Sequence, residues 1–246
     1  MGLVGREAGP AGMPSLALLP YRHEPADRRD SVSRGSRRVS LLPVARSSKA
    51  YGMALARSTL TNIRWRPERL ETEHLLLRGY ELSDCEGIFA YASDPAVAAY
   101  MAWDRHQSIE DTRRFLNTFV AANYRARELD YAICERGSSL RVIGGLGAYW
   151  RSRSHGVMEL GYVLAKEHWG KGYIPEAAKR LMAYAFETTD VQRIYAPILA
   201  ENTKSRRAAQ KMGMTLDGTL RSSLMLRGRR WDEAVFSMLR AEVSPG

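Results

Sequence analysis

The amino-acid sequence predicts one α+β domain built on a mixed, mostly antiparallel sheet. Segments with a two-residue hydrophobic period and segments with a helical period occur together without strict alternation. Most strand-like segments are joined by short polar connections, which favour hairpins. One pair is joined by a helix-length segment instead, which favours two parallel strands.

Each element follows from its hydrophobic period. The pattern predicts, in order, a strand near 74–80, helices near 84–92 and 109–127, strands near 131–135, 142–150 and 157–164, a helix after residue 172, a strand at 193–199 and a short helix that ends at Gly213. Short connections at 136–139 and 151–156 predict hairpins, and the residues around Gly228 predict a closing hairpin. The strands at 157–164 and 193–199 form the expected parallel pair.

The first 60 residues differ in composition from the rest of the chain. They are rich in Arg, Ser, Pro, Gly and Ala and lack sustained periodicity, which is typical of disorder. They carry 10 of the 37 Lys and Arg and 4 of the 27 Asp and Glu. We favour a misplaced start codon, with translation beginning near Met53, over a flexible interaction arm or a cleaved targeting peptide, which would be poor in acids. The folded domain is expected over residues 67–243.

Composition also bears on compartment and partners. No apolar run approaches membrane-spanning length, so we expect a soluble, cytoplasmic protein without membrane contact. Cys85 and Cys134 are the only cysteines, and both are predicted to be buried free thiols in a chain without a metal site. Arg and Lys of the folded part are interspersed with acids, so nucleic-acid binding is not expected there. A nucleic-acid binder led by the basic arm stays a third alternative.

A glycine turn joins the strand at 157–164 to the following helix. The hydrophobic period changes from two to helical at Gly170-Lys171-Gly172. Glycine permits positive φ, and the first amides of a helix have no internal partner and carry partial positive charge. The turn therefore predicts a pyrophosphate cradle. It lacks the Ser or Thr of a P-loop, and Pro175 replaces the third glycine of a dinucleotide fingerprint, which disfavours nucleotide hydrolysis and hydride transfer.

The turn resembles the cofactor loop of the GNAT superfamily of acyl-CoA-dependent N-acyltransferases, in particular its RimJ/RimL-type branch of protein N-terminal acetyltransferases. The positions that match the branch pattern Trp-Gly-x-Gly-Tyr-x-x-Glu-Ala are Trp169, Gly170, Gly172, Tyr173, Glu176 and Ala177. Against the broader superfamily pattern, Trp169 replaces a Gln or Arg and Ile174 replaces a small residue. The resemblance runs from about residue 70 to 243.

A second motif lies downstream of the turn. Asn202 and Ser205 have the Asn-x-x-Ser spacing of the family, Gly213 fits its helix stop, and Met214 stands where the family usually has Phe. Asn and Ser before a helix are also ordinary caps, and that interpretation stays open.

The resemblance implies a GNAT-like three-layer fold in which the parallel strands splay apart. It implies acetyl-CoA as co-substrate, no metal, a pantetheine arm paired with the first parallel strand and a pyrophosphate on the amides of 170–174. The residues expected to bind the cofactor are Tyr162, Val163, Leu164, Trp169, Gly170, Lys171, Gly172, Tyr173, Ile174, Asn202 and Ser205.

Acyl transfer to an amine requires a neutral nitrogen, so a base or a relayed water must take a proton. Glu159 is the candidate base, since it lies on the expected cofactor strand, facing away from Met158 and Leu160. A solvent-facing carboxylate without a catalytic role is the alternative interpretation. His155 and His168 rank lower, because both fall in predicted turns.

The other two steps concern the carbonyl oxygen and the leaving thiolate. A main-chain N–H near Val163 is the candidate donor to the oxyanion. Ser205 is the candidate donor to the thiolate, because Ala209 occupies the place where many relatives have a Tyr.

The sequence thus predicts an N-acetyltransferase that moves an acetyl group from acetyl-CoA to a primary amine by direct attack in a ternary complex. A protein or peptide N-terminal α-amino group is favoured over a small-molecule amine such as an antibiotic, a polyamine or an amino acid. Tyr100, Trp103 and Trp231 are candidates for the acceptor wall. A catalytically silent acyl-CoA-binding module is the alternative class, and a monomer or homodimer is expected.

Overall fold

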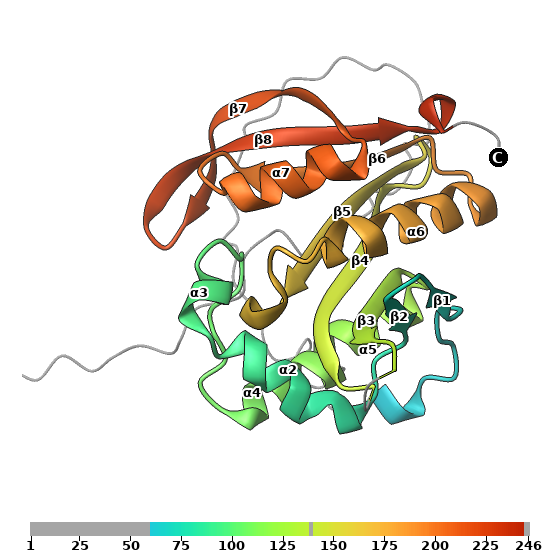
Figure 1. Cartoon of the computed structure of the whole chain (residues 1–246), viewed down its shortest axis with the longest axis vertical. Coiled ribbons are helices and arrows are strands. Elements are labelled where there is room, and N and C mark those ends of the chain that lie inside the picture. The colour runs from blue at the N-terminus through green and yellow to red at the C-terminus, as the bar shows by residue number, and fades with distance from the viewer. Residues whose placement is uncertain (1–59, 138–139, 244–246) are drawn as a thin grey trace, which may run out of the picture.

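The computed structural model describes residues 60–137 and 140–243, which form one eight-stranded sheet with helices on both faces (Figure 1). The expected leader over residues 1–60 lies, except for Leu60, outside the described residues. The strand order is β1-β2-β3-β4-β5-β6-β8-β7. The strands are β1 (Leu70–Glu71), β2 (Leu75–Arg78), β3 (Leu129–Glu135), β4 (Val142–Ser152), β5 (Val157–Leu164), β6 (Arg193–Leu199), β7 (Thr215–Leu226) and β8 (Arg229–Leu239).

The helices are short except for the one that follows the glycine turn. They are α2 (Cys85–Ala92), α3 (Pro95–Ala98), α4 (Ile109–Phe115), α5 (Ala121–Arg125), α6 (Tyr173–Thr188) and α7 (Thr203–Met212). A π-helical turn at Leu116–Val120 joins α4 to α5, so the helix predicted at 109–127 is one helical run that ends at Arg125. Single 3₁₀ turns occupy Leu60–Asn62, Leu82–Asp84, Lys166–His168 and Arg240–Glu242.

The pairing of the strands confirms the mixed sheet. All neighbouring strands pair antiparallel except β5 and β6, which are parallel and joined by α6. The short connections at 136–139 and 151–156 join antiparallel neighbours, as predicted, and β7 and β8 form the closing hairpin. A period-two pattern with polar turns is therefore a sound guide to this sheet, because each hairpin is local in sequence.

Alternate residues of β3 divide the interior into two cores. Tyr131 and Ile133 belong to the core under α6, whereas Ala132 and Cys134 belong to the core under α2 and α5. Successive side chains of a strand point to opposite faces, so a central strand buried on both faces reads as continuously apolar. The result is the three-layer arrangement that the sequence predicts. The two cysteines are free and buried, also as predicted.

Helix α6 fixes the position of the glycine turn relative to the sheet. Its buried face packs against the sheet and consists of Ala177, Ala178, Leu181, Met182, Ala185 and Phe186. Leu181 is completely buried, so truncation to Ala would cost about 2 to 5 kcal/mol. Glu176 in the first turn accepts hydrogen bonds from the amide and the ring Nδ1 of His74, which anchors the helix to the β1–β2 hairpin. None of the described helices is long and apolar enough to cross a lipid bilayer.

Candidate active site

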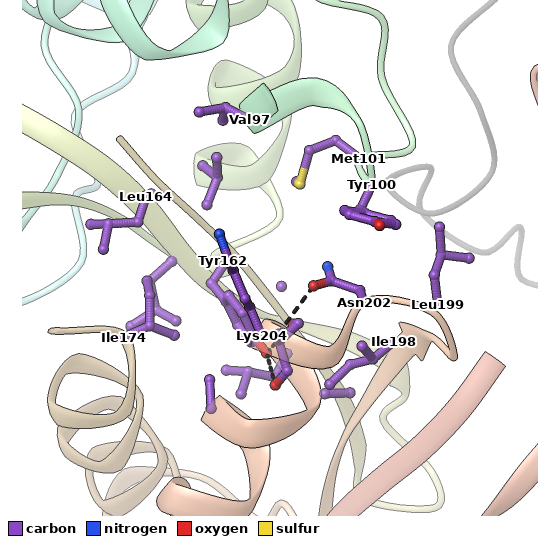
Figure 2. A pocket seen from close by; sticks show the side chains of 18 of the residues that line it. Val97, Tyr100, Met101, Tyr162, Leu164, Ile174, Ile198, Leu199, Asn202 and Lys204 are labelled. Atoms are coloured by element: carbon purple, nitrogen blue, oxygen red, sulfur yellow. Dashed lines mark hydrogen bonds between the residues drawn. The ribbon is translucent and has the colours of Figure 1, made fainter. Parts of the chain in front are cut away.

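The parallel strands β5 and β6 separate after a short paired region. Their pairing covers only Val157–Glu159 and Arg193–Tyr195, although β5 continues to Leu164 and β6 to Leu199. The separation opens a cavity of about 1000 Å³ that is lined by both strands, the glycine turn, the first turns of α7 and the segment between α3 and α4. Figure 2 shows Tyr100 and Met101 facing Asn202 and Leu199 across this space.

The cavity unites the predicted cofactor residues. All of those expected to bind the cofactor line it except Lys171, and the candidate base Glu159 lines it too. Lys171 lies outside, with its Nζ 5.5 Å from the centroid of the Tyr173 ring and 3.4 Å from Nδ1 of His168.

The glycine turn has the conformation that an anion cradle needs. Gly170 and Gly172 have φ of 83° and 86°, and apart from the adjacent residues no heavy atom lies within 4 Å of the place where a Cβ would stand on either glycine. In the described part of the chain, the amides of Gly170, Lys171 and Gly172 have no backbone acceptor. Gly172 is the N-cap of α6, so these donors adjoin the positive end of the helix. The residues present therefore fit a pyrophosphate.

Trp169 braces the turn against β5. Its indole Nε1 donates to the carbonyl of Leu164 at 2.8 Å, and Nζ of Lys204 lies 4.3 Å from the centroid of its ring. The residue that departs from the superfamily pattern thus links the end of β5 to the first turn of α7. An indole between a carbonyl and an ammonium group makes a hydrogen bond and a cation–π contact at once.

The Asn-x-x-Ser motif forms the entrance to α7. Oδ1 of Asn202 accepts from the amide of Ser205 at 3.1 Å, so Asn202 is the N-cap of α7. The hydroxyl of Ser205 lies 2.6 Å from the hydroxyl of Tyr162, which reaches across from β5. Burial raises the pKa of Tyr162 to about 12 in spite of this hydrogen bond, so its phenol keeps its proton at neutral pH.

Glu159 lies where β5 and β6 part, on the opposite face of the sheet from Met158 and Leu160. Its Oε2 accepts from Nε of Arg151 at 2.8 Å and from the hydroxyl of Tyr195 at 2.9 Å. The carboxylate side chain is 12 % exposed, so the alternative interpretation of a solvent-facing Glu gives way to a carboxylate held by two donors. Burial raises the pKa of Tyr195 to about 12, so this phenol remains a donor.

Backbone alternation decides which groups of β5 face the open edge. The amide of Ala165 donates to the carbonyl of Ile143 on β4, so the backbone groups of Val163 point to β4 as well. Those of Tyr162 and Leu164 point the other way, toward the separation. The carbonyl of Leu164 is already used by Trp169.

A buried carboxylate that the sequence analysis did not single out lies deeper in the cavity. Asp130 on β3 is 2 % exposed and accepts from the Tyr149 hydroxyl at 3.0 Å and from Nδ2 of Asn123 at 2.8 Å. Burial raises the pKa of Asp130 to about 6, against the lowering effect of these hydrogen bonds. The sequence signal that could have identified Asp130 is its position as a charged residue between two apolar strand residues, Leu129 and Tyr131, which are both buried.

Among the aromatic residues proposed for the acceptor wall, Tyr100 and Trp103 line the cavity, whereas Trp231 does not. Trp231 packs edge-on against Tyr100 instead, with ring centroids 6.5 Å apart. The neighbouring wall from the strand side includes Ile198 and Leu199. The wall of this half of the cavity is therefore mainly apolar.

The half of the cavity along α7 is basic. Lys204, Arg207 and Lys211 line it at spacings of three and four residues, which places them on one side of the helix. Within the described ranges none of the three forms an ion pair with a carboxylate. A polyanionic ligand would meet three uncompensated cations there. Across the same ranges, no group of three or more His, Cys, Asp or Glu residues is arranged to hold a metal ion.

Comparison with known proteins agrees with this geometry. Residues 74–215 match the model of the acetyltransferase (GNAT) domain family. YoaA of Bacillus subtilis (strain 168), named an uncharacterized N-acetyltransferase, is 32 % identical over 171 residues, which cover 70 % of this chain and 96 % of YoaA. The crystal structure of a GNAT-family acetyltransferase from Bacillus anthracis is 29 % identical, with a TM-score of 0.63 over 71 % of this chain and all of that one.

A third similarity concerns the fold alone. The ribosomal L7/L12 α-N-protein acetyltransferase RimL, solved in complex with coenzyme A, is 18 % identical, with a TM-score of 0.64 over 72 % of this chain and all of RimL. The splayed parallel strands, the open glycine turn and these similarities agree. The chain belongs to the GNAT family and is an N-acetyltransferase.

Proposed function

We propose that this enzyme transfers an acetyl group from acetyl-CoA to the N-terminal α-amino group of a protein or peptide, as a RimJ/RimL-type member of its family. The observation that carries the proposal is the open edge of β5, which lines the same cavity as the glycine turn, where the amides of Gly170 to Gly172 have no backbone acceptor among the described residues. A pantetheine arm contains amides that can pair with a strand edge, and a diphosphate suits a helix entrance. On α7, Lys204, Arg207 and Lys211 supply positive charge for the phosphate of coenzyme A that lies outside the diphosphate.

The acceptor is inferred from the volume and lining of the cavity and from one relative. The Tyr100–Trp103 segment and Leu199 line the acceptor side, and a cavity of about 1000 Å³ can admit an extended peptide end beside a pantetheine arm. RimL, whose fold the chain shares, acts on a protein α-amino group, as its name states. A compact amine would leave much of this apolar wall without contact.

The proposed mechanism uses both faces of the sheet. Glu159 takes a proton from the acceptor ammonium or amine, directly or through water, so that the nitrogen lone pair can attack the thioester carbonyl. The amide of Tyr162 faces the separation and donates to the developing oxyanion more readily than the amide of Val163. Attack forms the carbon–nitrogen bond and gives a tetrahedral intermediate; when its oxyanion re-forms the carbonyl, the carbon–sulfur bond breaks and the thiolate leaves with a hydrogen bond donated by Ser205. The second proton of the nitrogen passes to water. Tyr162 supports Ser205 through the hydroxyl contact.

A thiol-release assay tests the proposal. The enzyme is supplied with acetyl-CoA and, in separate reactions, with peptides bearing free or blocked N-termini, polyamines or aminoglycosides. We expect release of coenzyme A thiol only with free N-termini, and an acetyl group on the first residue by mass spectrometry. Release of coenzyme A thiol only with polyamines or aminoglycosides would show that the acceptor is a small-molecule amine and not a protein N-terminus. Binding of acetyl-CoA without thiol release for any amine would show that the protein is a catalytically silent acyl-CoA-binding module.

A further inference from the structure

One arginine at the tip of the β7–β8 hairpin holds the acceptor side of the cavity. Arg227 precedes Gly228 in the turn, and both have positive φ, 49° and 74°. The guanidinium of Arg227 donates to four backbone carbonyls of a segment more than 120 residues earlier in the chain. The acceptors are the carbonyls of Ala98 at 3.1 Å, Ala99 at 3.2 Å, Met101 at 3.2 Å and Trp103 at 2.9 Å.

The segment that Arg227 holds has little structure of its own. Helix α3 ends at Ala98 after a single turn, and α4 begins only at Ile109. The last carbonyls of a helix have no intrahelical partner, and a guanidinium with a fixed fork of N–H groups can satisfy several at once. Nε of Arg227 also lies 3.4 Å from Oδ1 of Asp104, which extends the contact along the segment. The conformation of 98–104 therefore depends on the hairpin tip.

Two further contacts join the hairpin to the cavity. Trp231 on β8 packs edge-on against Tyr100, and Arg229 lies 4.0 Å from the centroid of the Trp231 ring. Arg229 also forms an ion pair with Glu201, the residue before the cap of α7. The hairpin tip thus contacts the acceptor wall on one side and the entrance of α7 on the other.

The side chains of the held segment indicate what they would contact. Tyr100 and Met101 face Leu199 and Asn202 across the cavity (Figure 2), and Trp103 and Ile198 line it too, so the surface here is mainly apolar. An apolar pocket near the attacked carbonyl favours an acceptor whose amine is attached to a carbon bearing a bulky apolar side chain.

We propose that the hairpin tip and residues 98–104 form one acceptor subsite, in which Arg227 is the positioning residue that sets specificity for peptides with a bulky apolar first residue. This inference rests on the proposed function. Arg227 lies behind the wall and acts through the backbone that it holds, so its loss would move the wall without removing any lining side chain. Acetyl-CoA binding, which uses the glycine turn and α7, would be preserved.

Arg227→Met tests the proposal, with Arg230→Met as the matched control in the same hairpin. Arg230 donates to the carbonyl of Ser222 and, within the described residues, forms no hydrogen bond or ion pair with residues 98–104. The substrates are two peptides that differ only in a Leu or Gly first residue. For Arg227→Met we expect at least a tenfold loss of the Leu-over-Gly preference in kcat/KM, an unchanged Kd for acetyl-CoA and faster amide hydrogen exchange in 95–107. Arg230→Met should behave as the parent enzyme, and Arg227→Lys, with fewer donors, should lie between.

Trp103→Ala gives an independent test from the opposite side of the contact, because it shortens a lining side chain and leaves Arg227 intact. It should reduce the same preference without faster exchange. A parent enzyme that acetylates both peptides equally would overturn the subsite while leaving the proposed function in place. A parent enzyme that acetylates neither peptide would overturn both. A preference and an exchange pattern unchanged in Arg227→Met would exclude the positioning role.

Discussion

At the scale of single residues, the main difference between expectation and structure concerns the hydroxyl groups near the thiolate. The resemblance places a helix tyrosine of many relatives at Ala209, which is completely buried. A phenol nevertheless reaches Ser205, since Tyr162 supplies it from β5. No spacing rule relates a strand residue to a helix residue 43 positions later, so the sequence alone could not predict this contact.

Tyr162→Phe should lower kcat about tenfold while the Kd for acetyl-CoA changes little. The reason is that Ser205 loses its hydroxyl partner, whereas the backbone groups of residue 162 remain in place. Steady-state kinetics and calorimetry give the two quantities. Tyr184→Phe is the control, because Tyr184 bonds Glu68 at the surface. Equal kinetics in both variants would show that Ser205 does not use Tyr162.

Glu159→Gln should reduce kcat/KM by about 100-fold or more at neutral pH, in the range typical of a lost general base. The loss should shrink at alkaline pH, where more of the amine is neutral in solution. Tyr195→Phe removes one donor to Glu159 and keeps the carboxylate, so it should retain most of the activity. A rate loss of the same size at every pH would assign Glu159 to holding β5, β6 and Arg151 together.

At the scale of the elements, the glycine turn is the feature that the sequence predicted best. The change of period fixed the turn between β5 and α6, and the structure gives both glycines the left-handed conformation. The start of β3 was predicted two residues late, because Asp130 interrupts its apolar pattern. The single-turn helix α3 and the π-helical turn before α5 had no periodic signal, since both are too short to show a period.

Gly172→Ala should lower both stability and cofactor affinity. With φ of 86°, an L-residue at the N-cap of α6 costs about 1 to 2 kcal/mol, and no neighbour lies close enough to add a clash. Relaxation of that strain would turn the loop amides away from a common ligand. Denaturant titration and acetyl-CoA calorimetry measure the two effects. Gly218→Ala on β7, where φ is not positive and space is also open, should leave both values near those of the parent.

At the scale of the whole molecule, Asp130 couples stability to pH. The pKa of this carboxyl is about 6 in the folded state, and about 3.9 is usual for an unfolded chain. Between these values the folded state binds a proton that the unfolded state does not. The free energy of unfolding should therefore rise as the pH falls from 7 to 5, and the ionised group costs up to about 3 kcal/mol at neutral pH.

Urea denaturation at pH 5 and pH 7 tests this coupling. Asp130→Asn should be the more stable protein at pH 7, and its advantage over the parent should shrink at pH 5. Asp190→Asn, at an exposed position, controls for the loss of a negative charge. Parallel pH dependence in the parent and Asp130→Asn would show that this carboxyl does not change its proton affinity on folding.

The sequence predicted the layers of the molecule better than the acceptor side of its site. The cofactor half consists of one continuous strand, turn and helix, so its residues are close in sequence. The acceptor half joins Arg227 to residues near 100 and Asp130 to Asn123 and Tyr149. Such contacts follow from the order of the strands in the sheet, which local patterns do not contain.

Only three residue pairs connect β5 to β6, so this seam is the narrowest strand pairing in the middle of the sheet, although the core under α6 continues across it. A pulling force between residues 60 and 243 would act across this seam, because residue 60 precedes the strands on one side of it, β1 to β5, and residue 243 follows the strands on the other side, β6 to β8. A pantetheine arm bound along β5 would add contacts across this seam and strengthen it. In an optical trap, we therefore expect acetyl-CoA to raise the rupture force of the folded enzyme.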